Sequence, residues 1–197
     1  MSSALTLAQP ARLQQDIRKS RFLAQAEPVA DPAATLDVIA RLSDPLATHN
    51  CWAYRIGQHY RFADDGEPAG TAGRPILQAI EGQGVDRVIV VVTRWYGGIK
   101  LGAGGLARAY GGCAAECLRL ADKLPIVDLI EIRVHCEYAE LAALHARLRE
   151  HAAVKFGEHF DNGRAQMHLR LPRANADAFA DFVRDLTRGR GTIDGPP

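Results

Sequence analysis

Two stretches of the sequence concentrate residue types that could do chemistry. Residues 62–75 place three acids and three glycines in a predicted connection between a strand and a helix. Residues 93–112 follow an apolar run and carry seven glycines from position 97 onward. Glycine in such density is costly in backbone entropy, so it indicates unusual backbone angles or the close approach of another chain or ligand.

Phosphate binding is the first chemistry to test on the glycine-rich stretch. Residues 102–107 fit the pattern G-x-G-x-x-A. A dinucleotide-binding turn needs its first glycine directly after the strand, however, and residues 93–101 intervene here. A P-loop is excluded because Lys100 precedes its nearest glycine and no Ser or Thr follows it.

The acidic stretch could belong to a metal site or to a hydrolase. The potential ligands are His49, Cys51, Asp64, Asp65 and Glu67. They lack the short paired spacing typical of zinc sites, and no G-x-S-x-G sequence marks a nucleophilic serine. We therefore expect a structured turn whose carboxylates accept backbone N–H bonds, with no bound metal and no cofactor. The alternative is a metal-dependent hydrolase of the peptidase type that uses His49, Asp64, Asp65 and Glu67.

Nucleic-acid binding is the remaining chemistry, because no acid lies between Asp86 and Glu116. That window holds four cations and three aromatic residues: Arg87, Arg94, Lys100, Arg108, Trp95, Tyr96 and Tyr110. Cations, aromatic rings and glycines suit a phosphate backbone and unstacked bases. In the competing interpretation the aromatic rings pack inward, Arg87 pairs with Asp86, and the glycines only permit close helix–sheet packing.

Composition narrows the class of protein. The chain has 197 residues, with 24 Lys and Arg against 23 Asp and Glu, so it is not basic throughout. The longest apolar run, residues 88–92, is far shorter than a membrane span. Four cysteines are too few for a disulfide scaffold. With no signal-peptide pattern in residues 1–10, these features predict a cytoplasmic protein with reduced thiols.

The elements that must position these residues fall into two predicted domains, residues 1–125 and 126–197, because a helical pattern ends before Pro125. In the first domain, hydrophobic periodicity predicts strands over 21–29, 51–57 and 88–92, and helices after Asp31-Pro32, over 74–81 and over 105–121. In the second, it predicts strands over 130–136, 154–160, 167–171 and 192–193, with helices from Tyr138 and after Asn175. A turn at residues 161–163 joins two of these strands. The order β-α-β-β-α-(β) is that of a ferredoxin-like split βαβ sandwich.

Long motifs in the first domain resemble those of the IMPACT/YigZ family. They are His-Asn-Cys-Trp-Ala-Tyr-Arg from His49, Asp-Asp-Gly-Glu-Pro-x-Gly-Thr-Ala-Gly from Asp64, and Arg-Trp-Tyr-Gly-Gly-x-Lys-Leu-Gly-x-Gly-Gly-Leu-x-Arg-Ala-Tyr from Arg94. The resemblance is strong over residues 18–125. It departs at Trp95-Tyr96, where the family often has Tyr-Phe, and both positions stay aromatic.

The resemblance implies an α+β protein of two domains. The N-terminal one would have a ribosomal-protein-type βα fold, similar to the fourth domain of elongation factor G. The C-terminal one would be ferredoxin-like, similar to the fifth domain of that factor. Eukaryotic relatives regulate translation in a stress response, by competing for the activator of an amino-acid-starvation kinase. Some relatives carry a dipeptidase-type label, which no residue of this sequence supports.

We therefore predict a non-enzymatic regulator of translation that binds RNA, the ribosome or a ribosome-associated protein, with no membrane partner and no small-molecule cofactor. The predicted contacts are Arg94, Trp95, Tyr96, Lys100 and Arg108. The predicted glycine loop comprises Gly97, Gly98, Gly102, Gly104 and Gly105. The predicted acidic turn comprises Asp64, Asp65, Glu67, Thr71 and Arg74.

Overall fold

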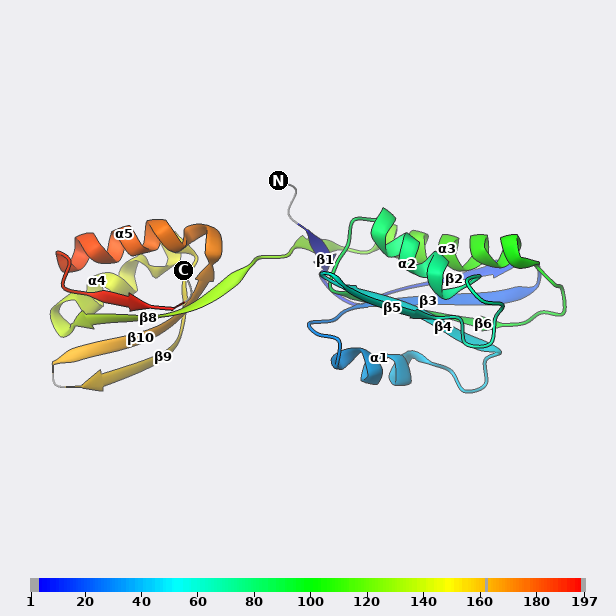
Figure 1. Ribbon diagram of the computed structural model, residues 1–197, viewed down its shortest axis with the longest axis horizontal. Coiled ribbons are helices and arrows are strands. Elements are labelled where there is room, and N and C mark those ends of the chain that lie inside the picture. The colour runs from blue at the N-terminus through cyan, green and yellow to red at the C-terminus, as the bar shows by residue number, and fades with distance from the viewer. Residues whose placement is uncertain (1–3, 162, 196–197) are drawn as a thin grey trace. The chain divides into compact units, whose positions relative to one another are not determined.

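The chain divides after Ile126 into two units, each with its own sheet and its own hydrophobic core (Figure 1). The structure, a computed structural model, describes residues 4–161 and 163–195. None of the helices in those two ranges is long and apolar enough to cross a membrane.

The first unit is built on a five-stranded antiparallel sheet. Its strand order is β2 (Ala11–Ile17), β3 (Ser20–Pro28), β6 (Val88–Trp95), β4 (His49–Ile56) and β5 (His59–Ala63). The central strand β6 is buried along its whole length except at Trp95. Figure 1 shows why: α1 (Ala34–Leu42) covers one face of the sheet, while α2 (Gly73–Gly82) and α3 (Ala103–Leu120) cover the other. The apolar run over 88–92 therefore is a strand buried on both faces, as predicted.

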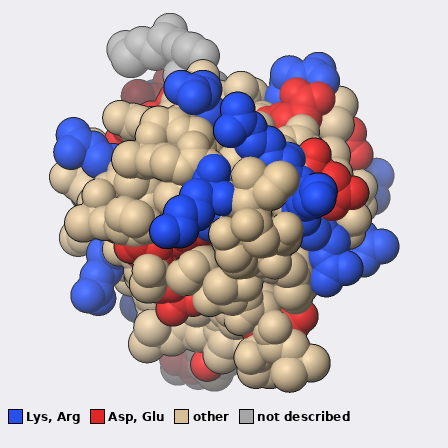
Figure 2. Space-filling model, turned by 90° about the vertical axis from the view of Figure 1, so that its right-hand side faces the viewer, with Lys and Arg blue, Asp and Glu red and all other residues tan. Residues whose placement is uncertain are grey.

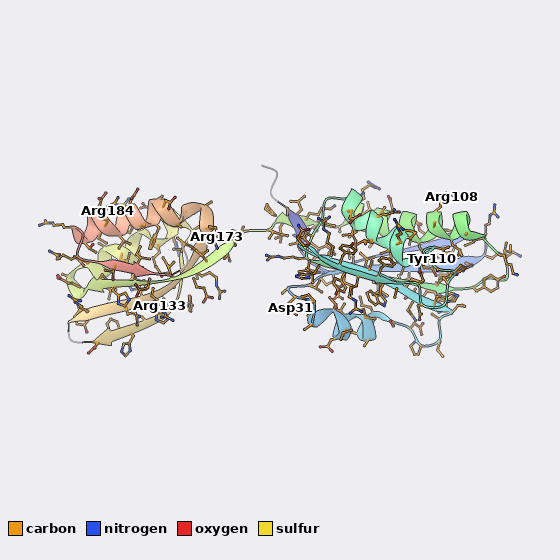
Figure 3. The ribbon with its side chains drawn as sticks, viewed as in Figure 1. Asp31, Arg108, Tyr110, Arg133, Arg173 and Arg184 are labelled. Carbon is orange, nitrogen blue, oxygen red and sulfur yellow. The ribbon has the colours of Figure 1, made fainter. Side chains whose placement is uncertain are left out.

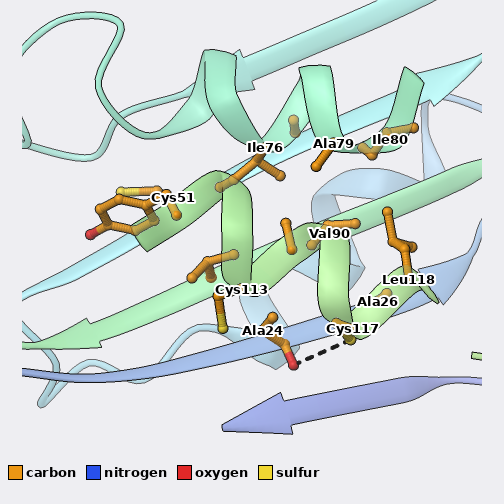
Figure 4. Packing of buried hydrophobic residues seen from close by; sticks show 14 of the residues in the cluster. Ala24, Ala26, Cys51, Ile76, Ala79, Ile80, Val90, Cys113, Cys117 and Leu118 are labelled. Carbon is orange, nitrogen blue, oxygen red and sulfur yellow. Dashed lines mark hydrogen bonds between the residues drawn. The ribbon is translucent and has the colours of Figure 1, made fainter. Parts of the chain in front are cut away.

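The main core of this unit lies between the sheet and the helices α2 and α3. The helical spacing of α3 predicts an inner stripe of Leu106, Tyr110, Cys113, Cys117 and Leu120, and the first four of these residues are buried. Leu120 is wrongly assigned, because it is 59% exposed at the last position of the helix. Figure 4 shows two of these thiols against the sheet, where Cys117 Sγ donates a weak hydrogen bond to the carbonyl oxygen of Ala24 at 3.7 Å. The thiols are free and serve as small apolar side chains.

The second unit is a four-stranded antiparallel sheet with both helices on one face (Figure 1). Its elements are β8 (Leu129–Glu137), α4 (Tyr138–Arg147), β9 (Val154–Asp161), β10 (Arg164–Pro172), α5 (Ala176–Thr187) and β11 (Thr192–Asp194), with short 3-10 turns at Leu148–His151 and Arg173–Asn175. The sheet order is β11-β8-β10-β9. This is the predicted β-α-β-β-α-β order, in which β10 lies between the two strands that α4 connects. The whole chain is thus an α+β protein.

Several elements differ from the expectation. The predictions omitted β2 and β5, as well as β1 (Leu5–Leu7) and β7 (Lys123–Pro125), which pair with each other. The segment after α3 is therefore a strand and not only a helix end. Asn175 precedes α5, but its side-chain amide donates to the carbonyl oxygen of His151 and does not cap the helix. Asn162 of the predicted turn lies outside the described residues.

Candidate nucleic-acid interface and its charged pocket

Asp64 organises the turn between β5 and α2. Its carboxylate accepts hydrogen bonds from the backbone N–H groups of Gly70, Ala72 and Gly73 at 2.8, 2.9 and 2.8 Å. Partial burial by itself would raise the pKa of this carboxyl, but the three N–H donors outweigh it and hold the pKa below its usual value. The turn is thus a structural feature held by one carboxylate, as the residue types predict.

Asp65 and His49 connect this turn to β4. Asp65 has a positive φ of 43°, which turns its carboxylate back to accept the backbone N–H of Asn50 at 2.5 Å. Its carbonyl oxygen lies 2.7 Å from His49 Nδ1. A carbonyl oxygen only accepts, so Nδ1 carries the hydrogen and the other ring nitrogen, Nε2, is left with its lone pair when the imidazole is neutral.

Glu67 forms a buried charge network with two residues from the glycine-rich stretch. Its Oε1 lies 2.6 Å from Arg94 Nη1 of β6 and accepts the hydroxyl of Tyr110 on α3 at 2.8 Å. The side chains of Glu67 and Arg94 are only 4% and 5% exposed. Arg94 also donates to the hydroxyl of Ser20 at 3.3 Å. Arg94 was predicted to be a surface contact, but the structure places it inside the protein, where it neutralises Glu67.

Each of the three carboxylates binds at least one partner within the protein. Asp64 binds backbone N–H groups, Asp65 binds Asn50, and Glu67 binds Arg94 and Tyr110. In residues 4–161 and 163–195 no group of three His, Cys, Asp or Glu side chains is placed to hold a metal ion. The donor set that the hydrolase alternative requires is not assembled by this geometry.

A pocket of about 390 Å³ opens above this network. Its floor contains His49, Glu67 and Arg94, and its walls are formed by Pro68, Tyr96, Leu101 and Leu106. Lys100 and the start of α3 complete the rim. The two motif stretches, far apart in sequence, thus meet in one concave site.

The glycines of the loop have distinct roles. A Cβ on Gly97 would overlap the carbonyl oxygen of Lys19, and the N–H of Gly97 donates to the Ser20 hydroxyl at 3.2 Å. Gly98 and Gly102 have φ values of 86° and 71°, which favour glycine. Gly104 and Gly105 lie in the first turn of α3, which contains no acid and has no side-chain cap. The loop is therefore held against the β2–β3 turn and leads into an uncapped helix N-terminus.

Five exposed cations gather where the β2–β3 turn meets the glycine loop. This basic surface consists of Arg18, Lys19, Arg21, Lys100 and Arg108, and none of the five forms an ion pair with a carboxylate of the described chain. Figure 2 shows Lys and Arg side chains across the middle of this end of the first unit, with acidic groups beside them. In Figure 3, Arg108 projects outward from α3, whereas Tyr110 lies between α3 and the sheet.

The predicted contacts divide into two groups. Tyr96, Lys100 and Arg108 are exposed, so they can reach a partner. Arg94 is buried, and Trp95 is half-buried beneath Arg21, whose guanidinium lies 3.8 Å from the centre of the indole ring.

The two remaining residues of the predicted acidic turn separate in the same way. Thr71 is buried, and its hydroxyl donates to the carbonyl oxygen of Pro68 at 2.6 Å. Arg74 is exposed on α2. Sequence reasoning missed Arg18, Lys19 and Arg21; the signal that could have found them is three cations within four residues.

Comparison with known proteins supports one family for both units. A family model described as the Impact N-terminal domain matches residues 18–118, and one described as a domain of unknown function (DUF1949) matches residues 134–190. A Thermus thermophilus protein described as an IMPACT family member in pol 5'region is 47% identical over 180 residues, 91% of this chain and 99% of the relative. The IMPACT family member YigZ of Escherichia coli (strain K12) is 36% identical over 197 residues, 96% of each chain.

More distant and structural matches agree with this assignment. Protein IMPACT of Mus musculus is 42% identical over 95 residues, which span 43% of this chain and 29% of that protein. A solved crystal structure described as that of a hypothetical protein matches with a TM-score of 0.75 and 33% identity, covering 100% of this chain and 98% of that one. The resemblance noted in the sequence motifs is confirmed, and the chain belongs to the IMPACT family.

Proposed function

We propose that this protein is a non-enzymatic, cytoplasmic regulator of translation that binds RNA, on the ribosome or free, through the basic surface of its first unit. The observation that carries the proposal is the group of five exposed cations without carboxylate partners. Arginine and lysine side chains placed in this way neutralise phosphates and release counterions, which is the main source of affinity for nucleic acid.

The construction of the basic surface also supports this proposal. Its two halves, Arg18–Arg21 and Lys100–Arg108, are joined through Gly97, which packs on Lys19, and through Ser20, which receives hydrogen bonds from both Arg94 and Gly97. A surface held by buried contacts presents its charges in a fixed arrangement, so less ordering entropy is lost on binding. The resemblance to translation-factor domains, including the fourth domain of elongation factor G, belongs to the same proposal.

Cosedimentation with ribosomes over a series of salt concentrations tests the proposal. The wild-type protein should bind with an affinity that falls steeply as salt rises. The variant Lys100→Ala/Arg108→Ala should bind more weakly, and the slope of log K against log salt should fall by about 0.7–0.9 for each phosphate that is no longer neutralised.

Arg149→Ala is the matched control, because Arg149 is an exposed arginine of the second unit with no ion pair in the described structure. It should bind like the wild type. Binding that ignores both salt and the Lys100→Ala/Arg108→Ala change would contradict the proposal, as would the absence of binding. Arg94→Ala is unsuitable for this test, since it would also break the buried network.

A further inference from the structure

The pocket floor contains a hydrogen-bond acceptor with no partner. Glu67 Oε1 binds Arg94 and Tyr110, but Glu67 Oε2 accepts no hydrogen bond from the described residues. Among the described residues, Arg94 Nε is the only side-chain nitrogen or oxygen that is both fully buried and unpaired. Glu67 Oε2 is also unpaired, so it cannot be fully buried. Solvent therefore reaches it through the pocket that Glu67 lines. A carboxylate 96% withdrawn from solvent with one open oxygen requires a donor from a ligand or water.

A second acceptor lies beside it. His49 donates through Nδ1 to the backbone, so in the neutral imidazole its Nε2 presents a lone pair 3.8 Å from Glu67 Oε1. The floor therefore offers two acceptors at one end of an apolar pocket. It favours a ligand whose buried edge carries N–H donors.

The rim has the opposite preference. Lys100 is exposed beside the uncapped N-terminus of α3, whose first-turn N–H groups have no intrahelical partners. Both features favour an anion. The wall between rim and floor includes Tyr96, which is 44% exposed and offers an aromatic face.

We propose that this pocket takes up the base of an unpaired RNA nucleotide, with the phosphate of that nucleotide at Lys100 and the first turn of α3. The base stacks on Tyr96 and donates an amino hydrogen bond to Glu67 Oε2. This inference rests on the proposed function, because it describes how the RNA on the basic surface is recognised. It adds that the protein selects single strands, since only an unpaired base can turn into a pocket.

The acceptors of the floor also imply a base preference. Adenine and cytosine carry an exocyclic amino group that can donate to Glu67 Oε2. Uracil has two carbonyl groups and only one ring N–H, so its carbonyl oxygens would face the carboxylate. Uridine should therefore be the poorest of these three nucleotides.

Fluorescence anisotropy with labelled oligoribonucleotides of about ten residues tests this inference. The probes are oligo-A, oligo-C, oligo-U and the oligo-A·oligo-U duplex. The wild-type protein should bind oligo-A and oligo-C about tenfold more tightly than either oligo-U or the duplex. Ala103→Trp, an exposed position on the pocket rim, should close the pocket and reduce oligo-A binding to the level of the duplex.

Ala143→Trp, on the exposed face of α4, is the matched control and should bind as the wild type does. Thermal unfolding of both variants checks that each is folded. If the wild type binds all four probes equally and Ala103→Trp binds like Ala143→Trp, the pocket inference is overturned while the proposed function stands. If no RNA binds at all, both fail. Displacement of oligo-A by peptides but not by nucleotides would also overturn the pocket inference.

Discussion

Glu67 and Arg94 meet at 2.6 Å inside the first unit, with neither side chain more than 5% exposed. Glu67 comes from the acidic turn and Arg94 from the end of β6, so one charge pair joins the two motif stretches. Tyr110, from the helical end of the second stretch, donates to the same carboxylate oxygen. The two stretches that were candidates for chemistry from their residue types are therefore joined by this buried network, which lies beneath the pocket.

Removing one partner of this pair should strongly destabilise the protein. Arg94→Met leaves the Glu67 charge buried without compensation, and the expected loss is about 3–5 kcal/mol in the free energy of unfolding. Glu67→Gln/Arg94→Met should lose less than the sum of the two single changes, because the residual charge is gone as well. Urea denaturation at neutral pH measures both.

Glu116→Gln supplies the comparison, since its partner Arg119 is exposed on the surface of α3. That change should leave the free energy of unfolding close to the wild-type value, because solvent screens an exposed ion pair. If Arg94→Met costs no more than Glu116→Gln, the network does not stabilise the fold.

Asp64→Ala should destabilise the first unit by about 2–4 kcal/mol at pH 7, because three backbone N–H groups lose their acceptor. The folded state lowers the pKa of Asp64 below its ordinary value of 3.8, so its stabilising contribution is present above that pH. The contribution is lost as pH falls through 3.8 toward the folded pKa. The stability gap between wild type and Asp64→Ala should consequently narrow in acid, as measured by urea denaturation over a pH series.

Asp37→Ala is the control, because Asp37 is exposed on α1 and accepts no side-chain hydrogen bond in the described structure. Its effect should be small at every pH. A gap for Asp64→Ala that stays constant into acid would contradict the assigned role of the carboxylate.

Gly97→Ala should open the contact between the glycine loop and the β2–β3 turn. A methyl group there overlaps the backbone carbonyl of Lys19, which cannot move without disturbing the hairpin, so about 3 kcal/mol or more should be lost. Gly98→Ala has open space around it and suffers only from its φ of 86°, at about 1–2 kcal/mol. Thermal unfolding of the two variants ranks them, and the reverse order would refute the packing role of Gly97.

The periodic elements were predictable from sequence, and the contacts between them were not. The spacing of apolar residues indicates the burial of the run over 88–92 and of the α3 stripe as far as Cys117, but not the exposure of Leu120 at the end of that stripe. Arg94 lies in the same strand as that run, but its burial depends on Glu67, 27 residues earlier, and no local pattern indicates such a pairing. Strand β2 was missed because adjacent glutamines, Gln14 and Gln15, interrupt the alternation of apolar and polar residues.

The buried thiols should be nearly inert in the folded protein. Burial raises the pKa of Cys51 and of Cys117 to about 12, and that of Cys113 to about 11. At pH 8 only about one part in ten thousand of a thiol with a pKa of 12 is the reactive thiolate. Iodoacetamide should therefore label the native protein very slowly and the urea-unfolded protein fast, as followed by mass spectrometry. Rapid native labelling at any of these three positions would contradict their burial.

The two cations of the β2–β3 turn should favour RNA binding at the expense of folding stability. Arg18 and Lys19 form a two-residue hairpin loop with φ values of 45° and 68°, where Asn-Gly would be less strained. Arg18→Asn/Lys19→Gly should therefore stabilise the protein by about 1 kcal/mol while weakening RNA binding. Arg18→Gln/Lys19→Gln removes the same charges and keeps the strain, so it should weaken binding equally without the gain in stability. Urea denaturation and oligo-A anisotropy on both variants separate the two effects. If Arg18→Asn/Lys19→Gly were no more stable than Arg18→Gln/Lys19→Gln, the two cations would not be held in a strained turn. If both variants bound RNA as the wild type does, the turn would not be part of the RNA-binding surface.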